Sequence, residues 1–97
     1  MKPRKCRRIE FEPSVFYFKP QGVPLRFLDE IELSAEELET MRLKNIQDLD
    51  QIKAAEKMHT SQSTFQRILS SAYKKVTIAL VEGKAIKVST KEDYKNY

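Results

Sequence analysis

The pattern of apolar and polar positions divides the chain into an extended segment to about Leu28, a helical middle and a lysine-rich tail. Residues 7–13 alternate polar with apolar side chains, which is typical of a half-buried strand. Proline and glycine then disfavour helix, so residues 16–25 are predicted to form an ordered loop. We expect the aromatic side chains of this loop to pack on the helical core, and stacking on exposed nucleic-acid bases is the alternative.

The first predicted helix begins at a capping box. Ser34 and Glu37 stand at the spacing at which the hydroxyl bonds a backbone amide and the carboxylate reaches back to the cap. An apolar stripe with three- and four-residue spacing follows to about Asn45, formed by Leu38, Met41, the stem of Arg42 and Ile46. The acidic residues at the helix start, Glu36, Glu37 and Glu39, are explained by favourable interaction with the helix dipole.

A short second helix is predicted from Gln51 to Met58, with Asp50 as its N-terminal cap. Its apolar residues are expected to face inward; they are Ile52, Ala54, Ala55 and Met58. His59 and Thr60 make the turn that follows. Glycine is favoured at the position of His59 because such a turn commonly requires a left-handed backbone, which histidine adopts less easily.

The third predicted helix is about twenty residues long, capped by Ser61 and ended by Gly83. One face is apolar and carries Phe65, Ile68, Leu69, Ala72, Val76, Ala79 and Leu80. Residues 84–89 alternate again, and a lone strand needs a partner. We predict a two-stranded antiparallel ribbon between residues 7–11 and 85–88, and a frayed tail over residues 90–97.

These elements predict a mainly α fold: a three-helix helix-turn-helix core with a small two-stranded β ribbon from the two end segments. Ninety-seven residues fit one domain, which we assign to residues 1–89. Within it, residues 1–28 are the basic arm and loop, residues 34–82 the helical core and residues 85–88 the strand.

Composition narrows the classes of function. With 40% hydrophobic and 33% charged residues and no long apolar run or signal peptide, we expect a cytoplasmic protein that does not enter a membrane. One cysteine, Cys6, and one histidine, His59, argue against a disulfide, a metal site or another cofactor. No phosphate-binding loop or nucleophile motif is present, so no catalytic residue is assigned and we do not expect an enzyme.

Charge is unevenly distributed along the chain, although the net value is only +4. Residues 1–28 carry seven basic against two acidic side chains, residues 29–58 four against nine, and residues 59–97 seven against three. Both ends are therefore positive, which favours contact of the arm and the C-terminal half with a nucleic acid. Solvated faces alone can also produce such a division.

The residues from Asp50 to Leu80 have the spacing of a helix-turn-helix. Ala55 is the small residue at the helix crossing, Met58 precedes the turn, Ser61 caps the second helix, and Phe65 and Ile68 anchor it. With these anchors inside, the opposite face presents the candidate base contacts Gln62, Ser63, Gln66 and Arg67 to a major groove. Glutamine can bond adenine in two places, and arginine can do the same with guanine. The candidate phosphate contacts are Lys2, Arg4, Lys5, Arg7, Arg8, Thr64, Ser70, Lys74 and Lys75.

The stretch from Gln51 to Leu69 resembles the DNA-binding fourth region of bacterial sigma factors. A wider resemblance, from Lys2 to Val88, is to a family of small, poorly characterised prokaryotic proteins predicted to bind DNA through that module. It rests on residues 4–8, 17–25, 33–39, 42–43 and 83–85 as well as on the helix-turn-helix. The resemblance implies a sigma-like or winged-helix-like fold and a DNA-binding role, with His59 and Ile52 where glycine and an acidic residue are usual.

Sequence-specific binding of double-stranded DNA by a transcriptional regulator is therefore the expected function. The main alternative is a protein-interaction module that docks on RNA polymerase or another regulator without reading DNA, and RNA binding is a third. Readers of this type often dimerise so that two recognition helices meet successive grooves. A homodimer interface is therefore a candidate role for residues 72–81 or for a free ribbon edge.

Overall fold

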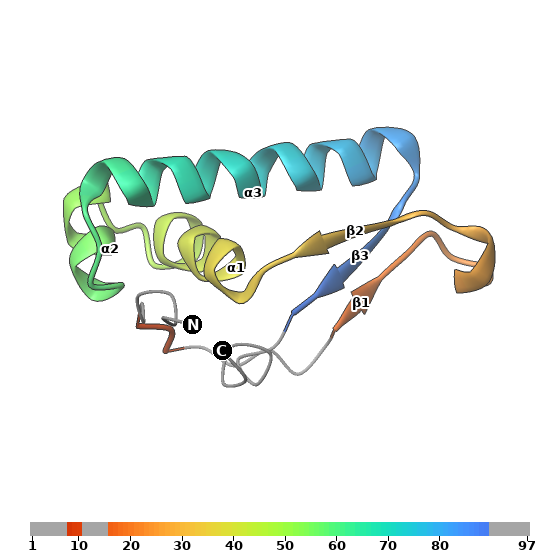
Figure 1. Ribbon diagram of the computed structural model, residues 1–97, viewed down its shortest axis with the longest axis horizontal. Helices are drawn as coiled ribbons and strands as arrows, with labels where there is room; N and C mark the ends of the chain where they lie inside the picture. The colour runs from red at the N-terminus through yellow and green to blue at the C-terminus, as the bar shows by residue number, and fades with distance from the viewer. Residues whose placement is uncertain (1–7, 11–15, 90–97) are drawn as a thin grey trace, which may run out of the picture.

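The computed structural model describes residues 8–10 and 16–89, which form three helices and a three-stranded sheet (Figure 1). The strands are β1 (Tyr17–Phe18), β2 (Glu30–Leu33) and β3 (Ala85–Val88). The helices are α1 (Ala35–Met41), α2 (Gln51–Lys57) and α3 (Gln62–Glu82), with a 3-10 turn η1 (Leu25–Phe27) and a π-helical extension η2 (Arg42–Ile46) of α1. The N-terminal half of α3 lies over α1 and α2, and its C-terminal half lies over the sheet.

The predicted helix caps are confirmed. The Ser34 hydroxyl accepts from Glu37 N at 3.0 Å, and the Glu37 carboxylate accepts from Ser34 N at 2.9 Å, which completes the capping box of α1. Asp50 caps α2, and Ser61 caps α3. α3 has 21 residues and ends at Gly83, whose φ of 71° is a left-handed conformation that glycine adopts without strain.

The sheet corrects the predicted ribbon. β3 is the central strand; it pairs antiparallel with β1 and parallel with β2. Residues 8–10, the described part of the expected first strand, are not in the sheet, and Arg7 and Phe11 lie outside the described residues. The predicted partner was wrong because an alternating pattern identifies a strand but not its neighbour. The region predicted as a loop instead supplies β1, and the tail over residues 90–97 is also outside the described residues.

One hydrophobic cluster joins the three helices at the N-terminal half of α3. Its fully buried members are Leu43, Ala54, Ala55, Met58, Phe65 and Leu69. Three residues predicted to face inward are exposed instead: 76% of Ile46, 58% of Ile52 and 76% of Leu80 is accessible. The short helices explain Ile46 and Ile52, since both stand near helix ends that no other element covers.

The aromatic side chains of residues 16–18 were expected to be packed on the helical core, but all three are exposed. They lie on or beside β1, an edge strand of two residues that leaves much of their surface uncovered. The helical core is instead filled by Met58, Phe65 and the small residues of α2.

Two acidic residues of α1 are buried rather than solvated at a helix start. Glu39 is 1% exposed and bonds Arg42 Nε at 2.8 Å, while its other oxygen accepts from Glu10 N at 3.2 Å. This hydrogen-bonded pairing raises the pKa of Arg42 above its ordinary value, despite burial. The helix dipole therefore does not by itself explain the acidic run, because two of its members hold tertiary contacts.

Candidate nucleic-acid interface

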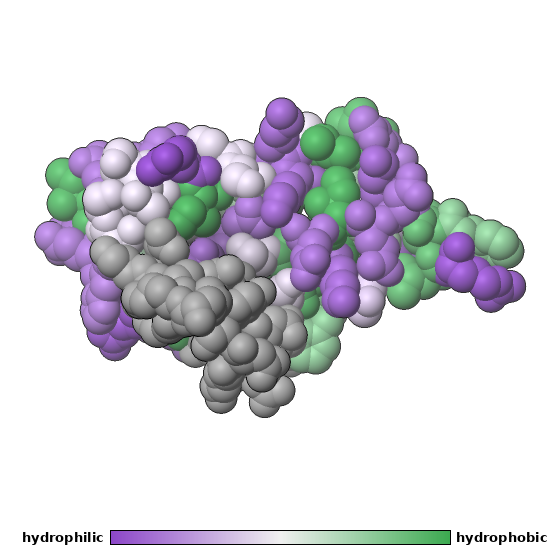
Figure 2. All heavy atoms as spheres, in the orientation of Figure 1, coloured by the Kyte–Doolittle hydropathy of each residue, from purple (hydrophilic) through white to green (hydrophobic). Residues whose placement is uncertain are grey.

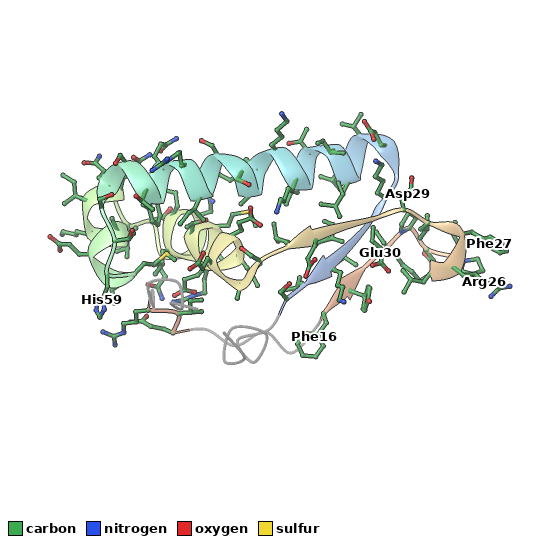
Figure 3. All side chains as sticks on the ribbon, in the orientation of Figure 1. Phe16, Arg26, Phe27, Asp29, Glu30 and His59 are labelled. Carbon is green, nitrogen blue, oxygen red and sulfur yellow. The ribbon has the colours of Figure 1, made fainter. Side chains whose placement is uncertain are left out.

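The turn between α2 and α3 is a Schellman motif. His59 N donates to Glu56 O at 3.0 Å, and Thr60 N donates to Ala55 O at 3.0 Å. In a Schellman motif the residue that donates the first of these bonds has a left-handed backbone conformation. That residue is His59, whose φ is 56°. The expected turn is confirmed, with histidine at the position that glycine normally occupies. His59 lies at the end of the molecule opposite to Phe27 (Figure 3).

The turn is fixed from inside by packing. Ala55 is buried where α2 meets α3, Met58 closes the C-terminus of α2, and Phe65 fills the space below the first turn of α3. Ala55 is 3% exposed, so a larger residue at this position would have to displace its buried neighbours. The crossing of the two helices is therefore set by buried contacts, while the polar residues on the outer face of α3 are exposed to solvent.

Four of the five polar residues predicted on that outer face are exposed: Gln62, Ser63, Arg67 and Ser70. The fifth, Gln66, is also exposed but is held in place by two hydrogen bonds. Gln51 on α2 donates to the Gln66 side-chain oxygen, and Gln66 donates to the Ser70 hydroxyl at 3.1 Å. A primary amide has two donors and two acceptor sites, so Gln66 keeps one of each for a ligand.

Charge along α3 is positive or neutral over most of its length. The helix carries Arg67, Lys74 and Lys75 and no acidic residue before Glu82. Among the described residues, no hydrogen bond or ion pair engages the guanidinium of Arg67 or the ammonium of Lys74. Lys75 is different, because its ammonium lies 3.0 Å from Glu37 Oε1 and 3.0 Å from Glu32 O. Thr64 is half-buried, and its hydroxyl accepts from Ser61 Oγ at 2.9 Å.

The N-terminal segment is attached close to the turn, which the sequence did not indicate. Arg8 N donates to Met58 O at 3.1 Å. The Glu10 carboxylate lies 3.3 Å from Arg8 and 3.3 Å from Arg42. Arg8 is therefore the one predicted arm contact that the structure describes; Lys2, Arg4, Lys5, Arg7 and also Cys6 lie outside the described residues.

A polar cluster around Glu37 lies where α1 meets α3 and β2. Burial alone would raise the pKa of Glu37, but hydrogen bonds from Ser71, Ser34 N and Lys75, with the charge of Lys75, outweigh burial and lower it. Glu37 is therefore held as a carboxylate. Its contacts join three elements, and they stabilise the fold without facing the outer side of α3.

Two classes of feature are missing from the part of the chain that the structure covers. Within residues 8–10 and 16–89, no three His, Cys, Asp or Glu side chains gather as they would around a metal ion. No helix there has the length and apolar character needed to cross a membrane.

A family model described as "Protein of unknown function DUF134" matches residues 1–96. Among similar proteins, all called "UPF0251 protein", those of Desulforudis audaxviator and Clostridium botulinum are 53% and 56% identical over 87 and 88 residues. These alignments cover 90% and 91% of this chain but only 57% and 56% of the relatives. The relative from Thermoanaerobacter pseudethanolicus is 53% identical over 90% of this chain and 74% of its own length. No solved structure matches the chain.

Proposed function

Since this chain belongs to the DUF134 family of small uncharacterised prokaryotic proteins, we propose that it binds double-stranded DNA sequence-specifically, with α3 in the major groove, as a transcriptional regulator. Membership of such a family, expected from the sequence, is thereby confirmed. The sigma-like role of the helix-turn-helix is part of the proposal.

The observation that carries the proposal is that two hydrogen bonds hold the side chain of Gln66 on the exposed face of α3. The bonds to Gln51 and Ser70 fix the amide plane and leave one N–H and one oxygen lone pair unused. An adenine edge in the major groove needs one acceptor and one donor in this arrangement. Because the amide is ordered before binding, little side-chain entropy is lost when the base is bound.

The next residue, Arg67, also supports the proposal of DNA binding by α3. Its guanidinium is exposed and has no ion-pair partner among residues 8–10 and 16–89, so its donors are available for guanine or a phosphate. The proposed phosphate contacts within the described chain are Lys74, Ser70 and Arg8. The backbone of Arg8 is attached to Met58, and its guanidinium lies 3.3 Å from Glu10. Lys75 is a weaker candidate than Lys74, since binding a phosphate would compete with its bonds to Glu37 and Glu32.

Selection of bound duplexes from a random pool tests the proposal and supplies the target. The recovered duplex is then titrated with the parent protein and with a Gln66→Ala, Arg67→Ala double variant over a series of salt concentrations. Loss of a bidentate base contact costs about 1–3 kcal/mol of discrimination, so the double variant should lose roughly 10-fold or more of its preference for the selected duplex. A Lys74→Ala variant should instead weaken all duplexes similarly and reduce the salt dependence.

Gln47→Ala is a matched control, because Gln47 is an exposed glutamine outside α2 and α3. It should bind like the parent. If the double variant discriminates between duplexes as well as the parent does, base readout by α3 is wrong.

A protein-interaction module is the second candidate function, and two exposed side chains favour it. Ile46, at the end of η2, and Ile52, in α2, are apolar and largely accessible. Such residues suit a docking contact on RNA polymerase or another regulator better than a contact with DNA. Absence of duplex binding even at low salt, together with loss of polymerase binding by Ile52→Ala, would favour this function over DNA reading.

A further inference from the structure

A second exposed apolar surface lies at the end of the molecule far from the α2–α3 turn. The connection between β1 and β2, residues 19–29, which we call the tip, extends beyond the sheet (Figure 1). At the tip, Phe27 is 68% exposed and Arg26 lies 4.6 Å from its ring centroid. Both side chains point away from the protein (Figure 3). Hydrophobic surface gathers here and over the adjoining end of α3 (Figure 2).

Beside the tip is a groove with an apolar floor. It has a volume of about 230 Å³ and lies between β1, β3 and the end of α3. Its lining includes Phe18, Pro20, Leu80 and Ile86, with Lys19 and Lys84. A cavity of about 150 Å³ accepts a benzene ring, so this groove can take the ring of a phenylalanine.

We propose that this end of the protein is a two-fold dimer interface, in which Phe27 of each copy enters the groove of the other. A projecting ring and a groove of suitable size occur on the same chain, which is what a self-complementary contact requires. The Arg26 side chain over the ring restricts its motion, so Phe27 is already ordered for insertion.

Charge supports a second copy as the occupant. Asp29 and Glu30 are exposed at the base of the tip, and within residues 8–10 and 16–89 neither forms an ion pair. Two lysines line the groove. Lys84 lies 3.1 Å from Glu82 of its own chain. The Lys19 ammonium bonds Val23 O at 2.8 Å and has no acidic partner among residues 8–10 and 16–89, so Lys19 is the positive charge available at the groove. An exchanged tip therefore brings the acidic pair of one copy towards Lys19 of the other, and the reciprocal contact repeats the attraction.

The exposed apolar area suits a weak dimer. Phe18, Phe27, Leu80 and Val81 are 54–78% exposed. At roughly 100 Å² of remaining surface for each side chain, two copies bury about 800 Å² of apolar surface. Interfaces smaller than the roughly 1,200 Å² of stable complexes are typical of weak, transient association. We therefore expect a reversible dimer rather than a permanent one.

The dimer leaves the outer face of Gln66 and Arg67 accessible. α3 has 21 residues and is therefore about 31 Å long, and the groove is at its C-terminal end. The inference does not rest on DNA binding, and its test contains no DNA, so its failure and the failure of the proposed function are separate results.

Sedimentation equilibrium of the full chain over a range of concentrations tests the interface. The parent should show a reversible monomer–dimer equilibrium, and Phe27→Ala should weaken dimerisation by about 10-fold or more, since each dimer loses two rings. Ile52→Ala is the matched control, because Ile52 is similarly exposed on α2. It should dimerise like the parent. A parent that stays monomeric, a polymer that grows without limit, or equal dimerisation of the parent and Phe27→Ala would overturn the proposal.

Charge reversal identifies the pairing across the interface. The D29K/E30K variant and the K19E variant should each weaken dimerisation, because each places like charges opposite one another. Combining the three substitutions should restore most of the parent's affinity. All three positions have solvent-accessible side chains, and circular dichroism checks that each variant is folded. Failure of the combined variant to recover would show that these charges do not meet across the interface.

Discussion

Replacing Glu37 with glutamine removes one charge from the junction of α1, α3 and β2 with little change of shape. Glu37 Oε1 accepts from Ser34 N at 2.9 Å and from Lys75 at 3.0 Å, and Oε2 accepts from the Ser71 hydroxyl. A glutamine oxygen can occupy the first position, and its amide can donate to the Ser71 oxygen. Glutamine also serves in a capping box, so the start of α1 should be preserved.

The expected loss follows from the strength of these bonds. Hydrogen bonds to a charged group contribute about 1.5–3 kcal/mol and neutral ones about 0.5–1.5 kcal/mol. The Lys75 side chain is 38% exposed, so its share is reduced by solvent screening. Glu37→Gln should therefore lower the free energy of unfolding by about 1–2 kcal/mol near neutral pH.

The pH dependence separates charge from shape. The pKa of Glu37 is lowered below 4.5 in the folded protein, because the hydrogen bonds and Lys75 outweigh burial. Its stabilisation is therefore complete above pH 4.5, the value for an unperturbed glutamate, and is lost as pH falls through the lower folded pKa. The glutamine variant lacks this contribution at every pH, so the difference between the two proteins should disappear in acid.

Urea unfolding followed by circular dichroism measures both quantities. Glu56→Gln, at an exposed position on α2, is the control for loss of a carboxylate and should unfold like the parent. Equal stability of parent and Glu37→Gln near neutral pH, or a difference that persists unchanged in acid, would refute this explanation of the junction.

Three further substitutions test the helix-turn-helix by thermal unfolding. Ser61→Ala removes the cap that Thr64 N bonds at 3.1 Å and should cost about 1 kcal/mol; an unchanged melting temperature would contradict the role of the cap. His59→Gly relieves a left-handed histidine at a φ of 56° and should stabilise the fold by up to about 1 kcal/mol, whereas a destabilised variant would mean that the imidazole makes a contact that outweighs the strain. Phe65→Ala empties a fully buried site and should cost about 3–5 kcal/mol, so retention of a parent-like transition would place Phe65 outside the cooperative core.

The sequence by itself determined the features that are made within a few residues. The capping box of Ser34 and Glu37, the caps at Asp50 and Ser61 and the helix end at Gly83 were all predicted and are confirmed. The polar face with Gln62, Ser63, Gln66 and Arg67 was also predicted to be exposed, and it is. These features are local because a helix end is satisfied by side chains one turn away, and because helical periodicity decides which residues share a face.

The tertiary structure decided the contacts between distant segments. Alternation predicted a strand at β3, but only the assembled sheet selected β1 and β2 as its neighbours. Glu39 meets Glu10 N across 29 residues, and Glu37 meets Lys75 across 38, so the acidic run gave no local sign that these side chains are buried. Ile46 and Leu80 have apolar neighbours at helical spacing and are nevertheless exposed, because a helix face is buried only where another element covers it.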